Sequence, residues 1–464
     1  MNLLTYDLIL LGIFVIFIVQ FLYRNRKRLN RDGLLYLYRT KWGMKVIDKF
    51  GKKHKKTLHV LSYVSITLGY ILMAGMLWLF YNIVKLYLTR KDLVQIIKIP
   101  PITPLFPYVD KLAPNLGLPT LHFVTFIIII AAIAIPHEFA HGIFMRRYGI
   151  KIKSTGFGFF PFFLPVFLAA FVEQDEKDME KKSNFKQMAV LSAGTFANVV
   201  TGILLLGVMI LFFVLAFSPA GVTFDGYASN VVEIAGISMI NNVSLENPNL
   251  EKISSMLDQG FNEIETDEGT FAGVRRVVSE NEIELYYDSP ALKNNLTGVI
   301  TKINGVEIKS IYELGEEINK YSPGGKVTLS IYDGEDVHDE DIVLEEHPEE
   351  EGKAWMGIGF SVDTRGGLVK LISSFKDKNV YYKPNFGAAE FIYNLLWWVV
   401  LCCFSVALVN MLPMGIFDGG RFFYLTILSL TKSKRKAENW FKWVTRFLLF
   451  LVILVMVFWA WSFF

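Results

Sequence analysis

Cysteine is almost absent from the 464-residue chain, which excludes a fold held together by disulfides. The two cysteines are the neighbours Cys402 and Cys403 inside an apolar run, and neighbouring cysteines rarely form a structural bridge. A Gly-rich phosphate loop and a basic patch interleaved with aromatic residues are also lacking, so we exclude nucleotide and nucleic-acid binding. Apolar residues, in contrast, make up 52% of the chain and are concentrated in long runs. This excludes a simple soluble enzyme and a disordered protein.

Six long apolar runs predict six membrane-spanning helices. They are Leu3–Tyr23, Leu61–Leu88, Leu121–Phe144, Met188–Phe217, Phe391–Leu412 and Trp440–Phe464. Basic residues follow the first run, whereas a cleaved signal peptide carries them in front, so we interpret this run as an anchor. A shorter aromatic run, Phe157–Val172, contains Gly158, Pro161 and Pro165, which argue against a straight span and predict a re-entrant hairpin.

The uneven distribution of charge predicts the orientation in the membrane. Residues 24–56 carry 13 Lys and Arg against two Asp, whereas residues 218–370 carry 29 Asp and Glu against 11 Lys and Arg. The basic clusters at 24–56, 146–147, 181–182 and 432–436 all fall between spans on one side, which the positive-inside rule assigns to the cytoplasm. Both termini and the acidic segment are then extracytoplasmic. The Lys, Ile and Phe bias without disulfides suits a prokaryotic cell membrane.

The acidic segment is predicted to form one large soluble domain, within residues 218–385. Alternating stretches such as Val327–Tyr332 and Asp341–Leu344 predict strands, and Asn304-Gly305 is a turn signal between such stretches. The rest of the chain divides into an N-terminal membrane region with two spans and a basic cytoplasmic loop (1–120), a first half of a membrane core (121–217) and its second half (386–464).

The sequence His137-Glu138-Phe139-Ala140-His141 near the end of the third span predicts a metal site. Positions i and i+4 share one face of a helix, so both imidazoles can reach one ion, and Glu138 can act as general base on a metal-bound water. A satisfied pair of core histidines is the simpler interpretation. Three ionisable groups in five residues of an Ile-rich span are expensive in hydrocarbon unless they serve a site, so we favour the metal.

A catalytic zinc takes three protein ligands, and Asp418 is the candidate for the third. It follows the fifth span in the segment Asn410–Gly420, and by itself the triplet Asp418-Gly419-Gly420 would be an ordinary interfacial turn. The third and fifth spans both run inward, however, so their ends meet at one depth.

The HExxH motif on one span, the acidic insertion and NxxPxxxxDGG on a later span together resemble a site-2 protease, an intramembrane zinc metalloprotease of regulated proteolysis. The resemblance covers residues 121–440. It implies that Zn²⁺ is bound by His137, His141 and Asp418, that Glu138 is the catalytic base, and that Asn410 and Pro413 hold substrate near the metal. The substrates implied are single-span membrane proteins in the lipid bilayer.

Secondary matches extend the resemblance. Residues 192–198 are similar to the family's AGPxxN element, with Thr195 where Pro is usual, and Phe417 replaces the usual Leu before the Asp. Residues 157–172 resemble the family's membrane-embedded β-hairpin, and residues 289–346 resemble a PDZ domain of the bacterial protease type. The fold expected is therefore a polytopic α-helical membrane protein with about six spans, a re-entrant β-hairpin and an inserted soluble PDZ-like α+β domain.

Two alternatives stay open. A membrane-anchored metalloprotease of another clan, with a Glu as third ligand, predicts that Asp418→Ala keeps zinc. A scaffold that captures peptides with its PDZ-like domain predicts no bound metal and indifference to Glu138→Gln, although a scaffold has no need of a base beside two metal ligands.

Overall fold

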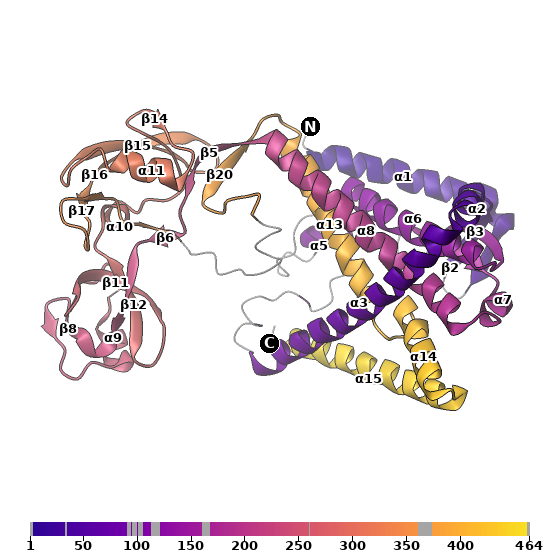
Figure 1. The fold of residues 1–464 in the computed structure, drawn as a ribbon. Coiled ribbons are helices and arrows are strands. Elements are labelled where there is room, and N and C mark those ends of the chain that lie inside the picture. Colours follow the sequence, from indigo (N-terminus) through magenta and orange to yellow (C-terminus); the bar gives the residue numbers. More distant parts are fainter. Residues whose placement is uncertain are drawn as a thin grey trace. The chain divides into compact units, whose positions relative to one another are not determined.

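The computed structural model of the chain divides into two units (Figure 1). It describes residues 3–32, 35–90, 94, 100, 105–112, 121–159, 168–258, 260–360 and 374–461. The first unit, here called the membrane unit, is Met1–Met209 with Phe391–Phe464, and the second unit is Ile210–Glu390. The finer predicted division into segments 1–120, 121–217, 218–385 and 386–464 stays a prediction.

Six helices in the described part of the chain are long and apolar enough to cross a membrane. They are α1 (Leu3–Asn25), α3 (Lys55–Thr89), α6 (Phe123–Arg147), α8 (Asn184–Ala216), α13 (Ala389–Asn410) and α15 (Lys434–Trp461). The shortest, α13, has 22 residues and a length of about 33 Å, enough for a hydrocarbon core of roughly 30 Å. Each of the six predicted spans coincides with one of these helices. Shorter helices of the membrane unit are η1 (Arg26–Arg28), α2 (Met44–Lys53), α5 (Val109–Leu112), α7 (Glu176–Glu180) and α14 (Asp418–Thr431).

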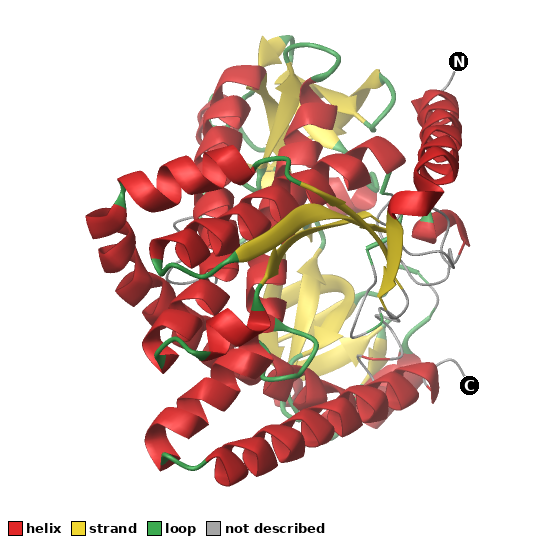
Figure 2. Ribbon diagram, turned by 90° about the vertical axis from the view of Figure 1, so that its right-hand side faces the viewer, coloured by secondary structure: helices red, strands yellow, loops and turns green. Residues whose placement is uncertain are grey.

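The membrane unit also contains a four-stranded antiparallel sheet in the order β1-β2-β3-β4 (Figure 2). The strands are β1 (Leu29–Asp32), β2 (Leu35–Thr40), β3 (Ile152–Phe159) and β4 (Leu168–Gln174). Both arms of the predicted hairpin are therefore strands, while residues 160–167 between them lie outside the described residues. The insertion of this hairpin into the membrane stays a prediction.

Strands β1 and β2 are a departure from the basic loop expected after the first span. The loop prediction rested on the charge of residues 24–56, but within it Tyr36 and Tyr38 are good strand formers. They pair with Phe159 and Phe157 of β3, so aromatic residues face one another across the strands. The N-terminal hairpin thereby occupies one edge of β3, and β4 occupies the other.

The first span holds the start of the helix that carries the HExxH motif. The Asp7 carboxylate of α1 accepts hydrogen bonds from the backbone N–H groups of Phe123 at 2.7 Å and Val124 at 3.0 Å, the first residues of α6. The Tyr108 hydroxyl donates to the same carboxylate. Helix α6 has no side-chain cap of its own at His122. Asp7 therefore supplies the cap from another helix.

The second span is equally part of the membrane unit's core. Ser192 of α8 donates a hydrogen bond to Ser65 of α3 at 3.1 Å. A Cβ on Gly69 of α3 would lie 3.2 Å from Met411 and 3.3 Å from Phe422, so this helix approaches the segment around Asp418 closely. The two N-terminal spans, for which the sequence indicates no role, therefore pack on the helices of the predicted catalytic core.

The second unit contains two larger antiparallel sheets. Their orders are β7-β12-β11-β10-β8-β9 and β16-β15-β13-β5-β20, with β14 paired to β13. The strands and helices of this unit are β5 (Phe217–Thr223), β6 (Gly226–Tyr227), β7 (Ser229–Glu233), η3 (Ile234–Gly236), β8 (Ile237–Ile240), β9 (Val243–Ser244), α9 (Leu250–Met256), β10 (Ile264–Thr266), β11 (Gly269–Val277), β12 (Glu282–Tyr287), α10 (Pro290–Lys293), β13 (Val299–Ile303), β14 (Val306–Glu307), α11 (Ile311–Ile318), β15 (Lys326–Tyr332), β16 (Val337–Val343), β17 (Glu345–Glu346), β18 (Ala354–Trp355), β19 (Ile358–Gly359) and β20 (Val380–Pro384). The predicted strand 327–332 coincides with β15, and the strand predicted at 341–344 begins earlier, because β16 pairs with the whole length of β15.

The two sheets of the second unit share one repeated motif. In both, a short hairpin is followed by a helix and then by a second hairpin, as β8-β9-α9-β10-β11 and as β13-β14-α11-β15-β16. The strands are also adjacent in the same order, β9-β8-β10-β11 in one sheet and β14-β13-β15-β16 in the other. The helices begin alike, because Asn249 caps α9 and Ser310 caps α11 through their side chains.

The turns of the two copies share one backbone conformation and one side-chain hydrogen bond. Asn241 and Asn304 both adopt a positive φ, of 49° and 46°. The side-chain oxygen of each accepts a backbone hydrogen bond, Asn241 from the N–H of Glu263, just before β10, at 3.0 Å and Asn304 from the N–H of Thr328 in β15 at 2.8 Å. Residues 237–277 are therefore a second copy of the motif in residues 299–343, where the sequence resembles a PDZ domain.

Removing the Asp7 cap is expected to destabilise the membrane unit. In Asp7→Ala, two backbone N–H groups at the start of α6 lose their acceptor, which for a helix cap lowers the free energy of unfolding by about 1–2 kcal/mol. The measurement is the thermal unfolding midpoint of the detergent-purified chain, with Tyr6→Ala as the control, because Tyr6 is exposed. Equal midpoints for the two variants would contradict the role given to Asp7.

Candidate active site

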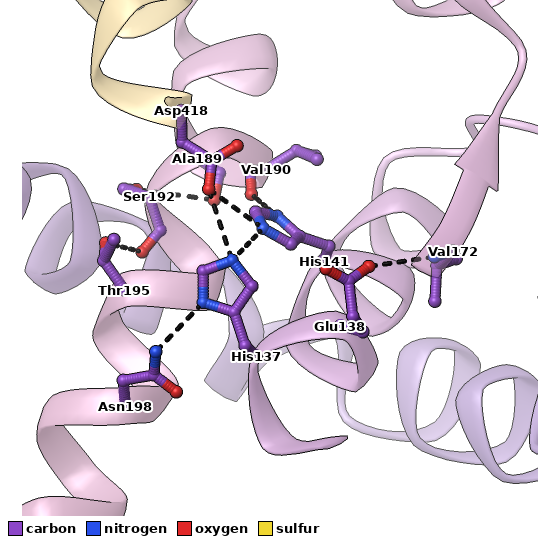
Figure 3. Close-up of polar contacts among 10 residues, drawn as sticks. All are labelled: His137, Glu138, His141, Val172, Ala189, Val190, Ser192, Thr195, Asn198 and Asp418. Atoms are coloured by element: carbon purple, nitrogen blue, oxygen red, sulfur yellow. Dashed lines mark hydrogen bonds and ion pairs between the residues drawn. The ribbon is translucent and has the colours of Figure 1, made fainter. Parts of the chain in front are cut away.

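Three side chains from two helices converge on one point (Figure 3). His137 and His141 lie one turn apart on α6, and Asp418 is the first residue of α14. Asp418 Oδ2 is 3.3 Å from Nε2 of each histidine, and the two Nε2 atoms are 3.0 Å apart. Zinc bonds of about 2.0–2.1 Å at tetrahedral angles separate ligand atoms by roughly 3.3 Å. The three groups therefore fit one tetrahedral ion with a fourth position left over.

The chain brings Asp418 to the histidines through a tight turn between α13 and α14. A Cβ on Gly419 or Gly420 would overlap the backbone of residues 411–415, so the turn closes only because both residues are glycines. Asp418 is consequently held at the start of a helix, where a carboxylate is favoured by the helix dipole. The triplet Asp418-Gly419-Gly420 is thus more than a surface turn.

The ring of His141 is oriented for binding a metal through Nε2. Its Nδ1 lies 2.7 Å from the carbonyl oxygen of Val190 in α8. A carbonyl accepts and cannot donate, so Nδ1 carries the proton and Nε2 presents its lone pair toward Asp418 and His137. This is the arrangement that metal-binding histidines usually have.

The ring of His137 has Asn198 of α8 as its second partner. The two side chains are 3.2 Å apart, from His137 Nδ1 to the Asn198 amide. With a metal on Nε2, Nδ1 carries a proton and needs an acceptor. Asn198 Oδ1 is buried and has no hydrogen-bond partner among the described residues, so a half-turn of the amide places this oxygen against Nδ1. The orphaned oxygen is therefore explained by a metal-bound His137.

Gly194 of α8 leaves the space that the two imidazoles occupy. A Cβ at this position would lie 2.5 Å from Nε2 and Cε1 of His137 and would also overlap His141 Nε2. Any side chain here would push the ligand atoms apart. Gly194 and Asn198 both belong to the 192–198 element that resembles the family's AGPxxN. In the structure, the glycine leaves room for the imidazoles and the asparagine contacts His137.

Glu138, the predicted base, lies on α6 beside the ligands and contacts the sheet. Its Oε2 accepts a hydrogen bond from the backbone N–H of Val172 in β4, at 2.9 Å (Figure 3). The N–H of Val172 therefore points away from β3. The N–H of Asp175, just past the end of β4, points in the opposite direction and donates to the carbonyl oxygen of Lys151. In the described part of the chain, β4 pairs with β3 alone. Within those residues, the edge of β4 that contacts the predicted base has no strand paired to it, and the Val172 N–H on this edge is bound by Glu138 of α6.

A cavity of about 550 Å³ adjoins the three ligands and Glu138. Its wall includes the charged side chains of Lys153, Glu173 and Glu176. Glu176 accepts a hydrogen bond from Arg421 of α14 at 2.7 Å. Burial raises the pKa of Glu176, but the hydrogen bonds from Arg421 and Gln174 outweigh it and hold that pKa below its usual range. The cavity is therefore polar enough to admit water to the predicted metal centre.

The two predicted substrate-binding residues are placed differently. Asn410, the last residue of α13, lines the cavity together with the ligands and Glu138. Pro413 is buried in the turn that leads to α14 and is not part of the cavity wall. Asn410 therefore lies at the site itself, whereas Pro413 can act on the site only by shaping the turn that leads to α14.

Several residues of the site have no signal in the sequence. Val190 and Val172 act through their backbone atoms, which any residue type supplies. In the sequence, Lys153 and Glu176 flank the hairpin and are indistinguishable from ordinary interfacial charges. Their position on the cavity wall follows from the pairing of β3 with β4.

Comparison with known proteins agrees with this geometry. The model of peptidase family M50 matches residues 125–455, which is more than half of the chain. The chain therefore belongs to peptidase family M50, the site-2 protease family, whose members are membrane metalloproteases and in general depend on zinc. The match includes the candidate metal ligands and the predicted base.

Two individual proteins are also similar. An uncharacterized protein from Methanocaldococcus jannaschii is 29% identical over 205 residues, which are 43% of this chain and 50% of the relative, so the chain spans about half the length of that protein. The crystal structure of the PDZ domain of an SdrC-like protein from Listeria monocytogenes is 29% identical, with 15% of this chain and 75% of that chain covered and a TM-score of 0.14. At this score the PDZ-like fold of residues 289–346 stays a prediction.

Gly194→Ala is expected to abolish metal binding, because the added methyl group would occupy the space of both Nε2 atoms. The measurement is zinc content per chain of detergent-purified protein. Gly207→Ala is a matched control on the same helix, since a Cβ there meets no atom within 4 Å. Equal zinc content in the two variants would rule out the site geometry described above.

Substitutions at Asn198 test its role as acceptor for His137. Asn198→Leu removes the acceptor and is expected to weaken zinc binding by about 10–100-fold, the usual effect of losing such a partner. Asn198→Asp offers a carboxylate oxygen at the same place and should retain most of the affinity. Zinc titration with a competing chelator measures both. If the Leu and Asp variants bind zinc alike, His137 does not depend on this contact.

Proposed function

We propose that this chain is an intramembrane zinc metalloprotease of the site-2 type. Its reaction would be hydrolysis of peptide bonds within or near the transmembrane segments of single-span membrane proteins. The observation that carries the proposal is the convergence of His137, His141 and Asp418, with Glu138 beside them, at the end of a helix long and apolar enough to span a membrane. Ionisable groups at such a place are costly unless they serve a site.

Zinc is the ion that fits these donors best. Two imidazole nitrogens and one carboxylate oxygen, all within 4.8 Å, match the ligand set of catalytic zinc with one position open. When bound, zinc acts as a Lewis acid toward a carbonyl and lowers the pKa of water toward roughly 7. Glu138 is adjacent to His137 in the chain and lines the same cavity, so it is placed to accept the proton of a water molecule there.

The contact between Glu138 and β4 orients this base. The Val172 N–H binds Oε2 and leaves the other carboxylate oxygen for the proton. Because the hydrogen bond comes from a backbone atom of a paired strand, the carboxylate is held by the sheet and not by a mobile side chain. A group held in this way loses little freedom when the reaction begins.

The edge of β4 that no described strand pairs with suggests how a substrate segment could bind. A helical substrate hides its carbonyl groups in i→i−4 hydrogen bonds and must unwind before it is attacked. Strand residues at even spacing point their backbone groups to the same side, so Ala170 and Gln174 share the outward direction of Val172. An extended substrate segment pairing with this edge would lie alongside Glu138. Such β-augmentation needs no particular side chain.

The second unit is proposed to select substrates from outside the cell. An apolar groove of about 240 Å³ lies beside α11, with Leu314, Ile318, Trp355 and Phe360 in its wall. Grooves of this kind bind extended peptides. The basic clusters between the spans support a topology with both termini and this unit extracytoplasmic and the active site near the cytoplasmic side of a prokaryotic cell membrane.

Metal content and cleavage test the proposal together. We expect about one zinc per chain in the wild type and its loss in Asp418→Ala, because one of three protein ligands is removed. Glu138→Gln should retain zinc but lose cleavage of a reporter transmembrane helix, since the amide cannot accept the proton.

The outcomes separate the alternatives. If Asp418→Ala retains zinc, another residue is the third ligand, and a metalloprotease of another clan is favoured. Cleavage retained in Glu138→Gln would refute the role of the base. If the folded wild type binds no zinc, the peptide-binding scaffold is the alternative that remains.

A further inference from the structure

Helix α2, between the first and second spans, packs directly on the part of α6 that carries the HExxH motif. A Cβ on Gly142 of α6 would lie 2.8 Å from Cδ1 of Ile47, which is fully buried. A Cβ on Gly51 of α2 would lie 2.6 Å from Cβ of Arg146. The two helices therefore approach one another through glycines, and their contact spans the turn after His141.

Polar contacts fix α2 to the end of α6. Asp48 and Arg146 form an ion pair at 2.5 Å, and Arg147 Nε donates a hydrogen bond to the carbonyl oxygen of Lys55 at 2.8 Å. Lys55 is the first residue of α3, directly after α2. A displacement of α2 would therefore act on the last turns of α6, where the metal ligands lie.

Large apolar side chains are exposed on α2 and just before it. The exposed fractions are 62% for Trp42, just before the helix, and 46% for both Val46 and Phe50. Val46 and Phe50 are four residues apart and share one face. Trp42 lies before the helix, and its ring also contacts Phe139 of α6. Val46 and Phe50, two large apolar side chains on one face beside the inner ends of membrane-spanning helices, are placed to enter a lipid layer.

A basic edge runs beside this apolar face. Lys45, Lys49 and Lys53 follow one another at intervals of four and are exposed. Among the described residues none of the three has an ion-pair partner, whereas Lys52 lies 4.0 Å from Asp48. A row of lysines flanking an apolar face is the pattern by which helices bind anionic membrane surfaces.

The position of α2 along α6 sets its depth. Its contacts on α6 extend from Phe139, next to Gly43, to Arg146. Arg146 and Arg147 end the α6 span, and basic residues at the end of a span lie at headgroup level. Helix α2 is consequently held where lipid tails meet headgroups, so its apolar face and its basic edge each have a matching part of the bilayer.

We propose that α2 is an interfacial helix whose Lys45, Lys49 and Lys53 bind anionic phospholipid headgroups, and that this binding holds the metal-bearing end of α6 in place. The occupant is the anionic lipid surface of the membrane in which the chain sits. The lipid binding stands independently of the chemistry at the site. The consequence for activity rests on the proposed protease function.

The test uses the full chain, reconstituted in vesicles of phosphatidylcholine alone or with about 30 mol% phosphatidylglycerol. The test variant is Lys45→Gln/Lys49→Gln/Lys53→Gln. The matched control is Lys434→Gln/Arg435→Gln/Lys436→Gln, which removes the same charge from three exposed residues at the start of α15. The readouts are hydrogen exchange of residues 42–53, zinc content, and cleavage of a reporter helix.

Phosphatidylglycerol should slow exchange of residues 42–53 by about tenfold or more in the wild type and the control, and not in the α2 variant, because three lysines are lost from the surface. Cleavage by the wild type and the control should rise with phosphatidylglycerol, while the α2 variant stays at its phosphatidylcholine rate and retains zinc. High salt should weaken both effects of the lipid.

Equal exchange in the two lipids, or a lipid effect that survives in the α2 variant, would overturn the proposal. If the wild type with zinc cleaves nothing in either lipid, the protease proposal fails, and the exchange data still decide on lipid binding. If exchange responds to lipid but cleavage does not, the coupling of α2 to the site is refuted.

Discussion

The physical constraint behind this structure is that polar groups within a membrane must find their partners inside the protein. Near the end of α6, the imidazoles of His137 and His141 and the carboxylate of Glu138 lie close together on an apolar helix, and each has a defined contact. Val190 binds His141, Asn198 faces His137, and Val172 holds Glu138. Asp418 completes the group from α14. These contacts come from four elements, so the site exists only when α8, β4 and α14 are packed against α6.

The N-terminal region contributes to this packing. Asp7 caps the start of α6, α2 packs on its end, and β2 covers the edge of β3 opposite β4. Of the sheet's two outer strands, β1 and β4, it is β4 that contacts Glu138. Two spans and a hairpin that carry none of the three candidate ligands therefore hold in place the helix that carries two of them and the strand that contacts Glu138.

The second unit shows how a weak sequence signal can hide a clear structural relation. Residues 299–343 contain the turn signal Asn304-Gly305, which supported the PDZ-like prediction. The matching turn at Asn241 is followed by another asparagine, and the copies share few identical residues. Strand order and the hydrogen bond of each asparagine side chain relate them all the same. Hydrophobic strands tolerate many substitutions, while the backbone geometry of such a turn does not.

The sequence by itself determined what depends on neighbours in the chain. The six spans follow from continuous apolar runs, and His137, Glu138 and His141 share a site because of helical spacing. Only the tertiary structure decided contacts between distant segments, such as Asp7 with the backbone of Phe123, 116 positions apart, and His141 with the backbone of Val190, 49 apart. The physical reason is that a backbone amide or a strand edge has no side-chain signature, so its partner is chosen by packing and not by local pattern.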